Sequence, residues 1–250
     1  LILAASVVKG TTIIKLAAME PHVQQLCHFL NSMGANISGI ATPTLVIEGA
    51  TKLHGANVAL IPDSEEASSL ITLAASTRSH VTVGSLNPEF LEDYLMRIGK
   101  MNVRFNRGKD YIEVLPPEGE YVGTKIQCGL YPKINSDYLP PMTVLATQSK
   151  GESLMYEWLY ENRLGHVPEL QKMGANIEIL DPHRIQVTGS TPLQGQSITG
   201  YDLRMGITLV IAGLVATGQT EIAGVNHIDR GYESIEGRLQ ALGADIKRVE

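Results

Sequence analysis

The feature that most constrains this chain is an internal repeat with a spacing of about 70 residues. In four places a run typical of a helix end is followed by glycine and then by an extended, apolar stretch. These places are MGAN at 33–36, IGKM at 98–101, MGAN at 173–176 and LGAD at 242–245. Glycine adopts the left-handed conformation that ends a helix without a side-chain clash. The four copies therefore predict a protein built by repetition of one small αβ unit.

Other segments recur at fixed places around these glycines. After the first three copies, PTLVIEG, DYIEVLP and HRIQVTG alternate between apolar and polar residues, as a strand with one wet face does. Strand-like stretches ending in LHGANVALIPD, KINSD and SITGYD then lead to Asp63, Asp137 and Asp202, and a nearly all-apolar helix follows each aspartate. A further strand and an amphipathic helix complete the unit. Each unit thus reads β-Asp-α-β-α-β-β, which predicts apolar helices packed together with sheets outside them.

Composition narrows the class of protein. With 250 residues, 44% hydrophobic and 18% charged, the chain can form one large or two modest domains. A net charge of −6 lacks the basic footprint of a nucleic-acid-binding protein. Cys27 and Cys128 have no metal-ligand spacing and are predicted to be reduced, packed thiols, as in the cytoplasm. The apolar stretch at 206–218 is shorter than the ~20 residues of a membrane span and predicts a buried helix.

The first and last residues of the sequence both resemble interrupted copies of the repeat. It opens with LILAASVVKG, which lacks an initiating Met and reads as the end of an apolar helix. The last copy stops at ADIKRVE, before the second strand of its hairpin. We therefore expect the sequence to be the later part of a longer protein.

Several long strings resemble the enolpyruvyl transferases, in particular those whose acceptor is UDP-N-acetylglucosamine. They are YENRLGHVPELQKMGANIE, YDLRMGITLVIAGLVATGQTEI and HIDRGYESIEGRLQALGADIKRV, and the resemblance covers essentially the whole chain. It implies an inside-out α/β barrel of repeated β-α-β-α-β-β units, N-terminally truncated. Residues 1–61 would be the remainder of the first lobe, and residues 62–250 would be a second lobe of three units. In the family, an N-terminal strand completes the last unit.

The resemblance also implies a reaction. The enolpyruvyl group of phosphoenolpyruvate would pass to the 3′-hydroxyl of UDP-N-acetylglucosamine through a tetrahedral ketal, with release of phosphate, in peptidoglycan precursor synthesis. This scheme needs no metal or cofactor. It implies a cytoplasmic enzyme with no nucleic-acid or membrane partner, whose active site also needs the N-terminal lobe. We expect these 250 residues alone to turn over poorly.

Asp137 is the predicted catalytic residue. It matches the family aspartate that hydrogen-bonds the sugar 3′-hydroxyl and takes its proton. From the repeat alone, Asp137 would instead cap the following helix, as Asp63 and Asp202 are expected to do. Both roles stay open at this point. Arg163, in YENR, matches the arginine that faces the phosphoenolpyruvate carboxylate, and its planar fork suits an oxyanion.

The resemblance extends the substrate-binding set to five further residues. These are Leu159, through its backbone carbonyl to the sugar nucleotide, Tyr160 on the sugar side, Arg204 and Arg230 as anion-binding arginines, and Glu20 in the cleft between the lobes. From the residues themselves, Glu161 is expected to pair with Arg163. His227 is a candidate supporting residue, and His166 is expected to hydrogen-bond at a helix start.

The chain departs from the family pattern at Ser64, Leu139, Pro141 and His22. The family's N-terminal lysine, its mobile loop with a cysteine or aspartate acid, and its uridine-contacting segment have no match in residues 1–250. Two alternatives follow: the related enzyme that acts on shikimate 3-phosphate, and a non-catalytic repeat scaffold.

Overall fold

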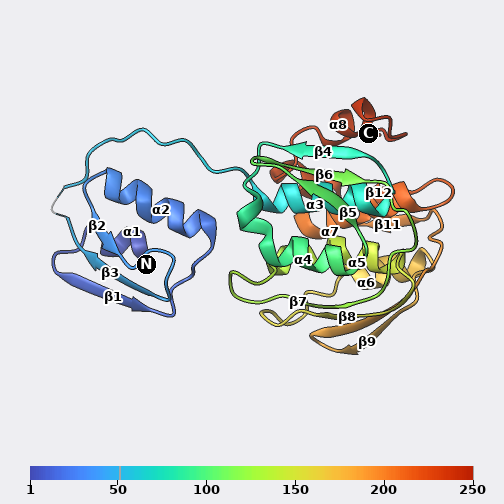
Figure 1. The fold of residues 1–250 in the computed structure, drawn as a ribbon, viewed down its shortest axis with the longest axis horizontal. Helices are drawn as coiled ribbons and strands as arrows, with labels where there is room; N and C mark the ends of the chain where they lie inside the picture. The colour runs from blue at the N-terminus through green and yellow to red at the C-terminus, as the bar shows by residue number, and fades with distance from the viewer. Residues whose placement is uncertain (51, 250) are drawn as a thin grey trace. The chain divides into compact units, whose positions relative to one another are not determined.

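The computed structural model describes residues 1–50 and 52–249 and separates into two compact units (Figure 1). The first unit consists of Leu1–Pro62 with Leu130–Pro132, and the second of Asp63–Gly129 with Lys133–Glu250. Each unit has its own hydrophobic core. No helix among the described residues is both long enough and apolar enough to cross a bilayer.

The first unit is one incomplete copy of the repeat. Its elements are α1 (Ile2–Ala5), β1 (Thr11–Lys15), α2 (Pro21–Ser32), β2 (Asn36–Ser38) and β3 (Thr44–Glu48), and its antiparallel sheet has the order β1-β3-β2. The amphipathic α2 begins at Pro21, as predicted, because a proline at the first helical position loses no hydrogen bond. Cys27 and Leu30 of α2 pack on the apolar side chains of β2 and β3.

The second unit contains three copies of the same order of elements, of which the first and the last are incomplete. They are α3 (Ser64–Ser76), β4 (Val81–Gly84), η1 (Pro88–Leu91), α4 (Glu92–Lys100), β5 (Arg104–Arg107), β6 (Tyr111–Leu115), β7 (Lys125–Gln127), η2 (Ser136–Tyr138), α5 (Leu139–Thr147), β8 (Gly151–Tyr156), α6 (His166–Lys172), β9 (Ile177–Asp181), β10 (Arg184–Gly189), β11 (Ser197–Thr199), α7 (Leu203–Val215), β12 (Glu221–Ala223), η3 (Val225–Arg230) and α8 (Ile235–Ala241).

Three apolar helices form the centre of this unit. α3, α5 and α7 pack on one another, and Figure 1 shows them between the sheet that contains β4 and β6 and the sheet that contains β7 and β8. Every residue of α5 is buried. A helix that is apolar all round must be covered on all sides. The predicted inside-out arrangement, with helices inside and strands outside, is confirmed.

The sheets show which copies are complete. The order β7-β8-β10-β9 combines a parallel pair, β7 with β8, and two antiparallel pairs. The sheet β4-β6-β5 reproduces its last three strands, and the parallel pair β11-β12 reproduces its first two. Only the middle copy of the second unit therefore has all four strands among the described residues. In the incomplete last copy, a cavity of about 970 Å³ lies between β12 and residues 245–249.

Two predicted strands are absent from the described residues. Residues 52–62, predicted to lead into Asp63 as a strand, form none and instead join the first unit, where Gln25 Nε2 donates to the Ala59 carbonyl (2.8 Å). Residues 244–249 form no strand either, because the hairpin partner that β10 provides for β9 has no counterpart beside them. A strand needs a neighbour to satisfy its backbone groups.

One predicted helix stop was also wrong. Gly34, Gly174 and Gly243 adopt the positive φ of a helix stop, with φ of 101°, 94° and 96°. Gly99 does not, because α4 continues through it to Lys100 and Asn102 takes the left-handed position with φ of 65°. Asparagine tolerates this conformation better than most residues.

Candidate active site

Aspartates precede two of the central helices as N-caps. The Asp63 carboxylate accepts hydrogen bonds from the backbone N–H groups of Glu65 (2.8 Å) and Glu66 (3.2 Å) at the start of α3. The Asp202 carboxylate accepts one from the N–H of Met205 (2.9 Å) in α7. These aspartates satisfy N–H groups that the helix itself leaves without partners.

Asp137 precedes the third central helix but does not cap it. The side chain of Asn135, two residues earlier, accepts from the backbone N–H of Asp137 (3.1 Å), and α5 starts without a side-chain cap. The Asp137 carboxylate instead faces two arginines. Its Oδ1 accepts from Arg163 Nη1 (2.8 Å) and Arg204 Nη1 (3.3 Å), whereas Oδ2 has no hydrogen-bond partner in residues 1–50 and 52–249. The capping role considered for Asp137 was wrong.

Hydrogen bonds bring the starts of the three helices together. Asn135 Nδ2 donates to Glu65 Oε1 near the start of α3 (3.0 Å), and Arg204 of α7 bridges Asp137 and Asp202, with Nη2 2.9 Å from Asp202 Oδ2. The N-terminal end of a helix carries partial positive charge and free N–H groups. Asp63 and Asp202 already occupy the N–H groups at two of these ends, so the two guanidinium groups are the main feature that suits this part of the second unit to an anionic ligand.

Arg163 is held in a fixed plane. Its Nη1 also donates to Ser136 Oγ (2.8 Å), and its Cζ lies 3.8 Å from the centroid of the Tyr160 ring. Stacking of a guanidinium on an aromatic face restricts its orientation. Nε and Nη2 keep their N–H groups free of described partners. The expected pairing with Glu161 was wrong, because Arg163 contacts Asp137 and Ser136, whereas Glu161 Oε1 lies 4.0 Å from His183 Nε2.

The sequence reasoning missed Glu157, which lies directly after β8. Its side chain is 1% exposed. Oε1 accepts from Cys128 Sγ (3.2 Å) and from the N–H groups of Leu159 (2.9 Å) and Tyr160 (3.1 Å), and Oε2 accepts from Ser136 Oγ. A signal was available, since Ser153 and Met155 occupy the buried face of β8 and period-2 alternation places Glu157 on the same face.

Several ionisable groups near the helix starts have shifted pKa values, among them Glu65 and His166. Burial, and then the negative charges of Asp137 and Asp63, raise the pKa of Glu65. Burial lowers the pKa of His166, the first residue of α6, to about 4. His166 Nε2 lies 3.2 Å from Thr143 Oγ1, which agrees with the hydrogen-bonding role expected for it at a helix start. A buried histidine with a lowered pKa therefore lies near the charges of Asp202 and Arg204.

The other predicted site residues are less closely connected. Leu159 and Tyr160 lie on the loop after β8, where Glu157 holds their N–H groups. Arg230 ends η3, is exposed and makes no ion pair with a described residue, so its convergence with Arg163 and Arg204 stays a prediction. Glu20 belongs to the first unit, directly before α2, and its role also stays a prediction.

Two further observations bear on the composition of the site. Leu139 and Pro141, which depart from the family pattern, are buried within α5, so these apolar side chains belong to the core. Cys27 and Cys128 are free and buried, as predicted. In the part of the chain that the structure describes, no group of three His, Cys, Asp or Glu side chains is arranged to hold a metal ion.

The family profile described as EPSP synthase (3-phosphoshikimate 1-carboxyvinyltransferase) matches residues 1–239. The chain belongs to this family. Among curated relatives, the UDP-N-acetylglucosamine 1-carboxyvinyltransferase of Clostridium botulinum is 40% identical over 247 residues, which covers 99% of this chain and 59% of the relative. The enzyme of the same name from Prochlorococcus marinus is 41% identical over 248 residues, covering 99% of this chain and 56% of the relative. The chain thus spans less than two thirds of the length of these relatives.

Solved structures agree on the fold. The enolpyruvyl transferase NikO from Streptomyces tendae superposes with a TM-score of 0.89 at 27% identity, covering 98% of this chain and 58% of that one. EPSP synthase from Acinetobacter baumannii gives a TM-score of 0.75 at 18% identity, covering 100% of this chain and 60% of that one, and shows the fold alone. The enolpyruvyl transferase fold predicted from the repeat and the long strings is confirmed.

Proposed function

We propose that this chain supplies the Asp137 wall of the active site of a cytoplasmic enolpyruvyl transferase. The enzyme would transfer the enolpyruvyl group of phosphoenolpyruvate to the 3′-hydroxyl of UDP-N-acetylglucosamine, releasing phosphate, for peptidoglycan synthesis and hence cell shape and division. The observation that carries the proposal is the free Oδ2 of Asp137, at a helix start where the equivalent aspartates are caps. The choice of acceptor is supported by relatives about 40% identical over nearly the whole chain.

Asp137 would act as the general base. Both arginines bind Oδ1, and the Asp137 side chain is 28% exposed, so Oδ2 can accept the proton of an incoming hydroxyl. The sugar oxygen then attacks C2 of phosphoenolpyruvate while C3 gains a proton, which gives the tetrahedral ketal. Loss of phosphate from C2 and of a proton from C3 restores the double bond in the product. The donor of the C3 proton belongs to the part of the relatives that has no match in this chain.

Arg163 and Arg204 would bind the anionic groups of phosphoenolpyruvate. Each guanidinium uses only part of its five N–H donors on Asp137, Asp202 and Ser136, and the others are available to a carboxylate or phosphate. These donors are already oriented by protein contacts, so little reorganisation is needed as negative charge develops. The predicted roles of Leu159, Tyr160, Arg230 and Glu20 on the acceptor and anion side belong to the same proposal.

The test is a phosphate-release assay on a chimera that joins residues 1–250 to the part of the Clostridium botulinum relative that this chain does not match. Phosphoenolpyruvate is supplied with either UDP-N-acetylglucosamine or shikimate 3-phosphate as the acceptor. We expect release with the sugar nucleotide. Asp137→Asn should lower kcat by about 100-fold or more, since general-base catalysis contributes about 10²–10⁴. The amide oxygen can still accept from the arginines, so the fold should remain.

Asp110→Asn is the matched control. Asp110 is exposed and its side chain makes no hydrogen bond with a described residue, so its replacement should leave kcat unchanged. Release with shikimate 3-phosphate alone would replace the proposed acceptor with that of the related enzyme. Absence of release with both acceptors, in a folded chimera, would favour the scaffold alternative. Full activity of the Asp137→Asn variant would refute the role of Asp137 as the base.

A further inference from the structure

We propose that Glu157 is a positioning residue that fixes the direction of a hydrogen-bond chain from the protein interior to the Arg163–Asp137 pair. This inference rests on the proposed function for its catalytic consequence. The hydrogen-bond chain itself is a property of the folded second unit and can be tested without substrate.

The backbone and side chain of Glu157 are both fixed. Its N–H donates to the His183 carbonyl (2.8 Å), and its own carbonyl lies 2.8 Å from His183 Nδ1. Both carboxylate oxygens act as acceptors, Oε1 from a thiol and two backbone N–H groups and Oε2 from Ser136. With every neighbour donating, the side chain functions as a buried carboxylate. Buried charges of this kind persist in proteins when they are fully hydrogen-bonded.

The direction of the hydrogen-bond chain follows from which of its groups can donate. Arginine has N–H donors and no acceptor, so the contact between Arg163 Nη1 and Ser136 Oγ must be donated by Arg163. The single Ser136 proton is therefore free to point at Glu157, which accepts it. Ser136 is 2% exposed, so water is not an alternative partner for this proton. The negative charge of Glu157 thus reaches Arg163 through one hydroxyl group.

The same carboxylate joins the two loops of the site. Ser136 and Asp137 come from the turn before α5, whereas Tyr160 and Arg163 come from the loop between β8 and α6. Glu157 binds the hydroxyl of the first loop and the N–H of Tyr160 in the second. It therefore fixes both the ring on which Arg163 stacks and the hydroxyl to which Arg163 donates.

Glu157→Gln is the informative substitution because it keeps the size and removes the charge. If Gln Oε1 stays on the two backbone N–H groups, the amide N–H₂ faces Ser136 and donates to its oxygen. Ser136 then receives hydrogen bonds from both sides, and its proton is left without the acceptor. Arg163 loses a well-oriented partner. Ser136→Ala removes the same link with a smaller change to the core, and it serves as the second variant.

The experiment is a side-chain NMR measurement on this chain labelled with ¹⁵N-arginine, with the Arg163 signals assigned from Arg163→Lys. In the parent chain, hydrogen bonds and stacking hinder rotation of the guanidinium, so separate Nη1 and Nη2 signals are expected. Both Glu157→Gln and Ser136→Ala should merge these signals. The double variant should show no further change, because both substitutions break one link.

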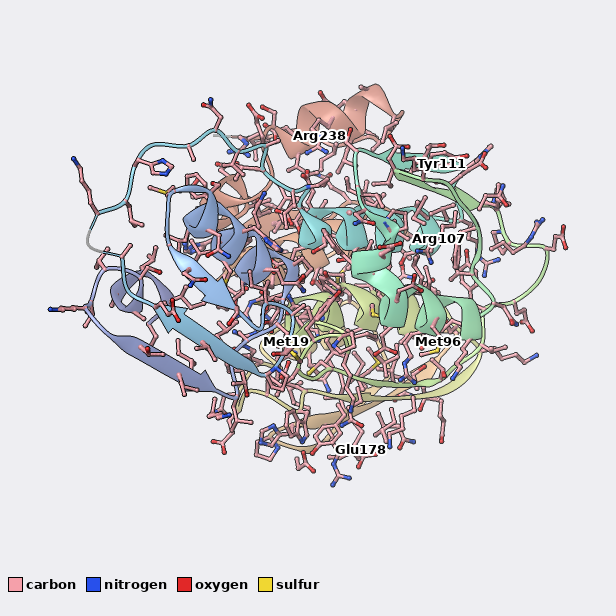
Figure 2. The ribbon with its side chains drawn as sticks, turned by 60° about the vertical axis from the view of Figure 1, so that its left-hand side comes forward. Met19, Met96, Arg107, Tyr111, Glu178 and Arg238 are labelled. Atoms are coloured by element: carbon pink, nitrogen blue, oxygen red, sulfur yellow. The ribbon has the colours of Figure 1, made fainter. Side chains whose placement is uncertain are left out.

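Glu178→Gln is the control, because Glu178 is exposed on β9 of the same sheet and Figure 2 shows its side chain on the outside. It should leave the Arg163 signals separate. Trp158 fluorescence checks that each variant is folded. If Glu157→Gln does not fold, Ser136→Ala decides alone. Separate Arg163 signals in the folded variants would overturn the inference, whatever the transferase assay gives. In the active chimera, Glu157→Gln should lower kcat/KM for phosphoenolpyruvate about tenfold, the equivalent of one hydrogen bond to a charged group.

Discussion

The burial of His166 predicts how the free energy of unfolding of the second unit depends on pH. Its imidazole is 2% exposed and packs against Thr143 of α5. Burial lowers its pKa from 6.5 to about 4; the nearby charge of Asp202 opposes this shift and that of Arg204 adds to it, both to a smaller extent. The perturbation is His166→Gln, which keeps a hydrogen-bonding side chain and removes the titration.

The direction in which stability changes with pH follows from whether the folded or the unfolded chain binds the proton. Above pH 6.5, His166 is neutral in both the folded and the unfolded chain. As the pH falls below 6.5, the unfolded chain takes up a proton at this position, whereas the folded chain resists until about pH 4. The stability contributed by His166 is therefore present above pH 6.5 and is lost as the pH falls. Between pH 7 and pH 5 the loss is about 2 kcal/mol, since each pKa unit corresponds to about 1.36 kcal/mol.

The assay is urea unfolding at pH 7 and pH 5, followed by fluorescence. Trp158 is the single tryptophan of the chain and lies in the second unit, so it reports on the unit that contains His166. Between pH 7 and pH 5, the free energy of unfolding of the parent chain should fall by about 2 kcal/mol more than that of His166→Gln. Other titrating groups are common to both proteins and cancel in the difference. His227→Gln, at an exposed position of the same unit, should behave like the parent. Equal losses in the parent and His166→Gln would refute the reasoning.

Three further predictions concern packing and reactivity in the second unit. Gly123→Ala should lower the free energy of unfolding by about 1–3 kcal/mol, because a methyl group would overlap the carbonyl oxygen of Glu152, whereas Gly119→Ala meets nothing and should change it little in urea titrations. Tyr94→Phe should cost about 1–2 kcal/mol in the same assay, because the Tyr94 hydroxyl makes two buried hydrogen bonds. Cys128, whose pKa burial raises to about 12, should react with a thiol reagent only as fast as the second unit unfolds, and rapid reaction in buffer would contradict its burial.

Local patterns predicted much of the fold because each unit repeats the same signals. Apolar runs after Asp63, Asp137 and Asp202 gave the central helices, and alternating stretches gave the strands. The strand before Asp63 failed because strand formation depends on a neighbour, which is a long-range property. The stop at Gly99 failed because Asn102 could take the same backbone conformation.

The site was predicted only in part, and for a related reason. The family strings identified Arg163 and Arg204, and the repeated aspartate together with the family match identified Asp137; the structure brings these three together. No local pattern shows that the Asn135 side chain takes the N–H of Asp137. Alternation along β8 indicates that Glu157 faces inward, but it does not show that Glu157 meets Ser136, the partner of Arg163. Those contacts join residues that are distant in the chain or depend on one turn. Arg230 and Glu20 await the substrate experiments.

Asp137 differs from its counterparts Asp63 and Asp202 in what its carboxylate contacts, although all three occupy the same place in the repeat. Each of the three copies in the second unit has an aspartate just before its inner helix, and in two of them the aspartate caps that helix. In the middle copy, Asn135, two positions upstream, instead caps the short η2 turn that precedes the helix, and the Asp137 carboxylate is left to contact the two arginines. The reaction proposed for Asp137 therefore requires no residue type at that position that the other two copies lack.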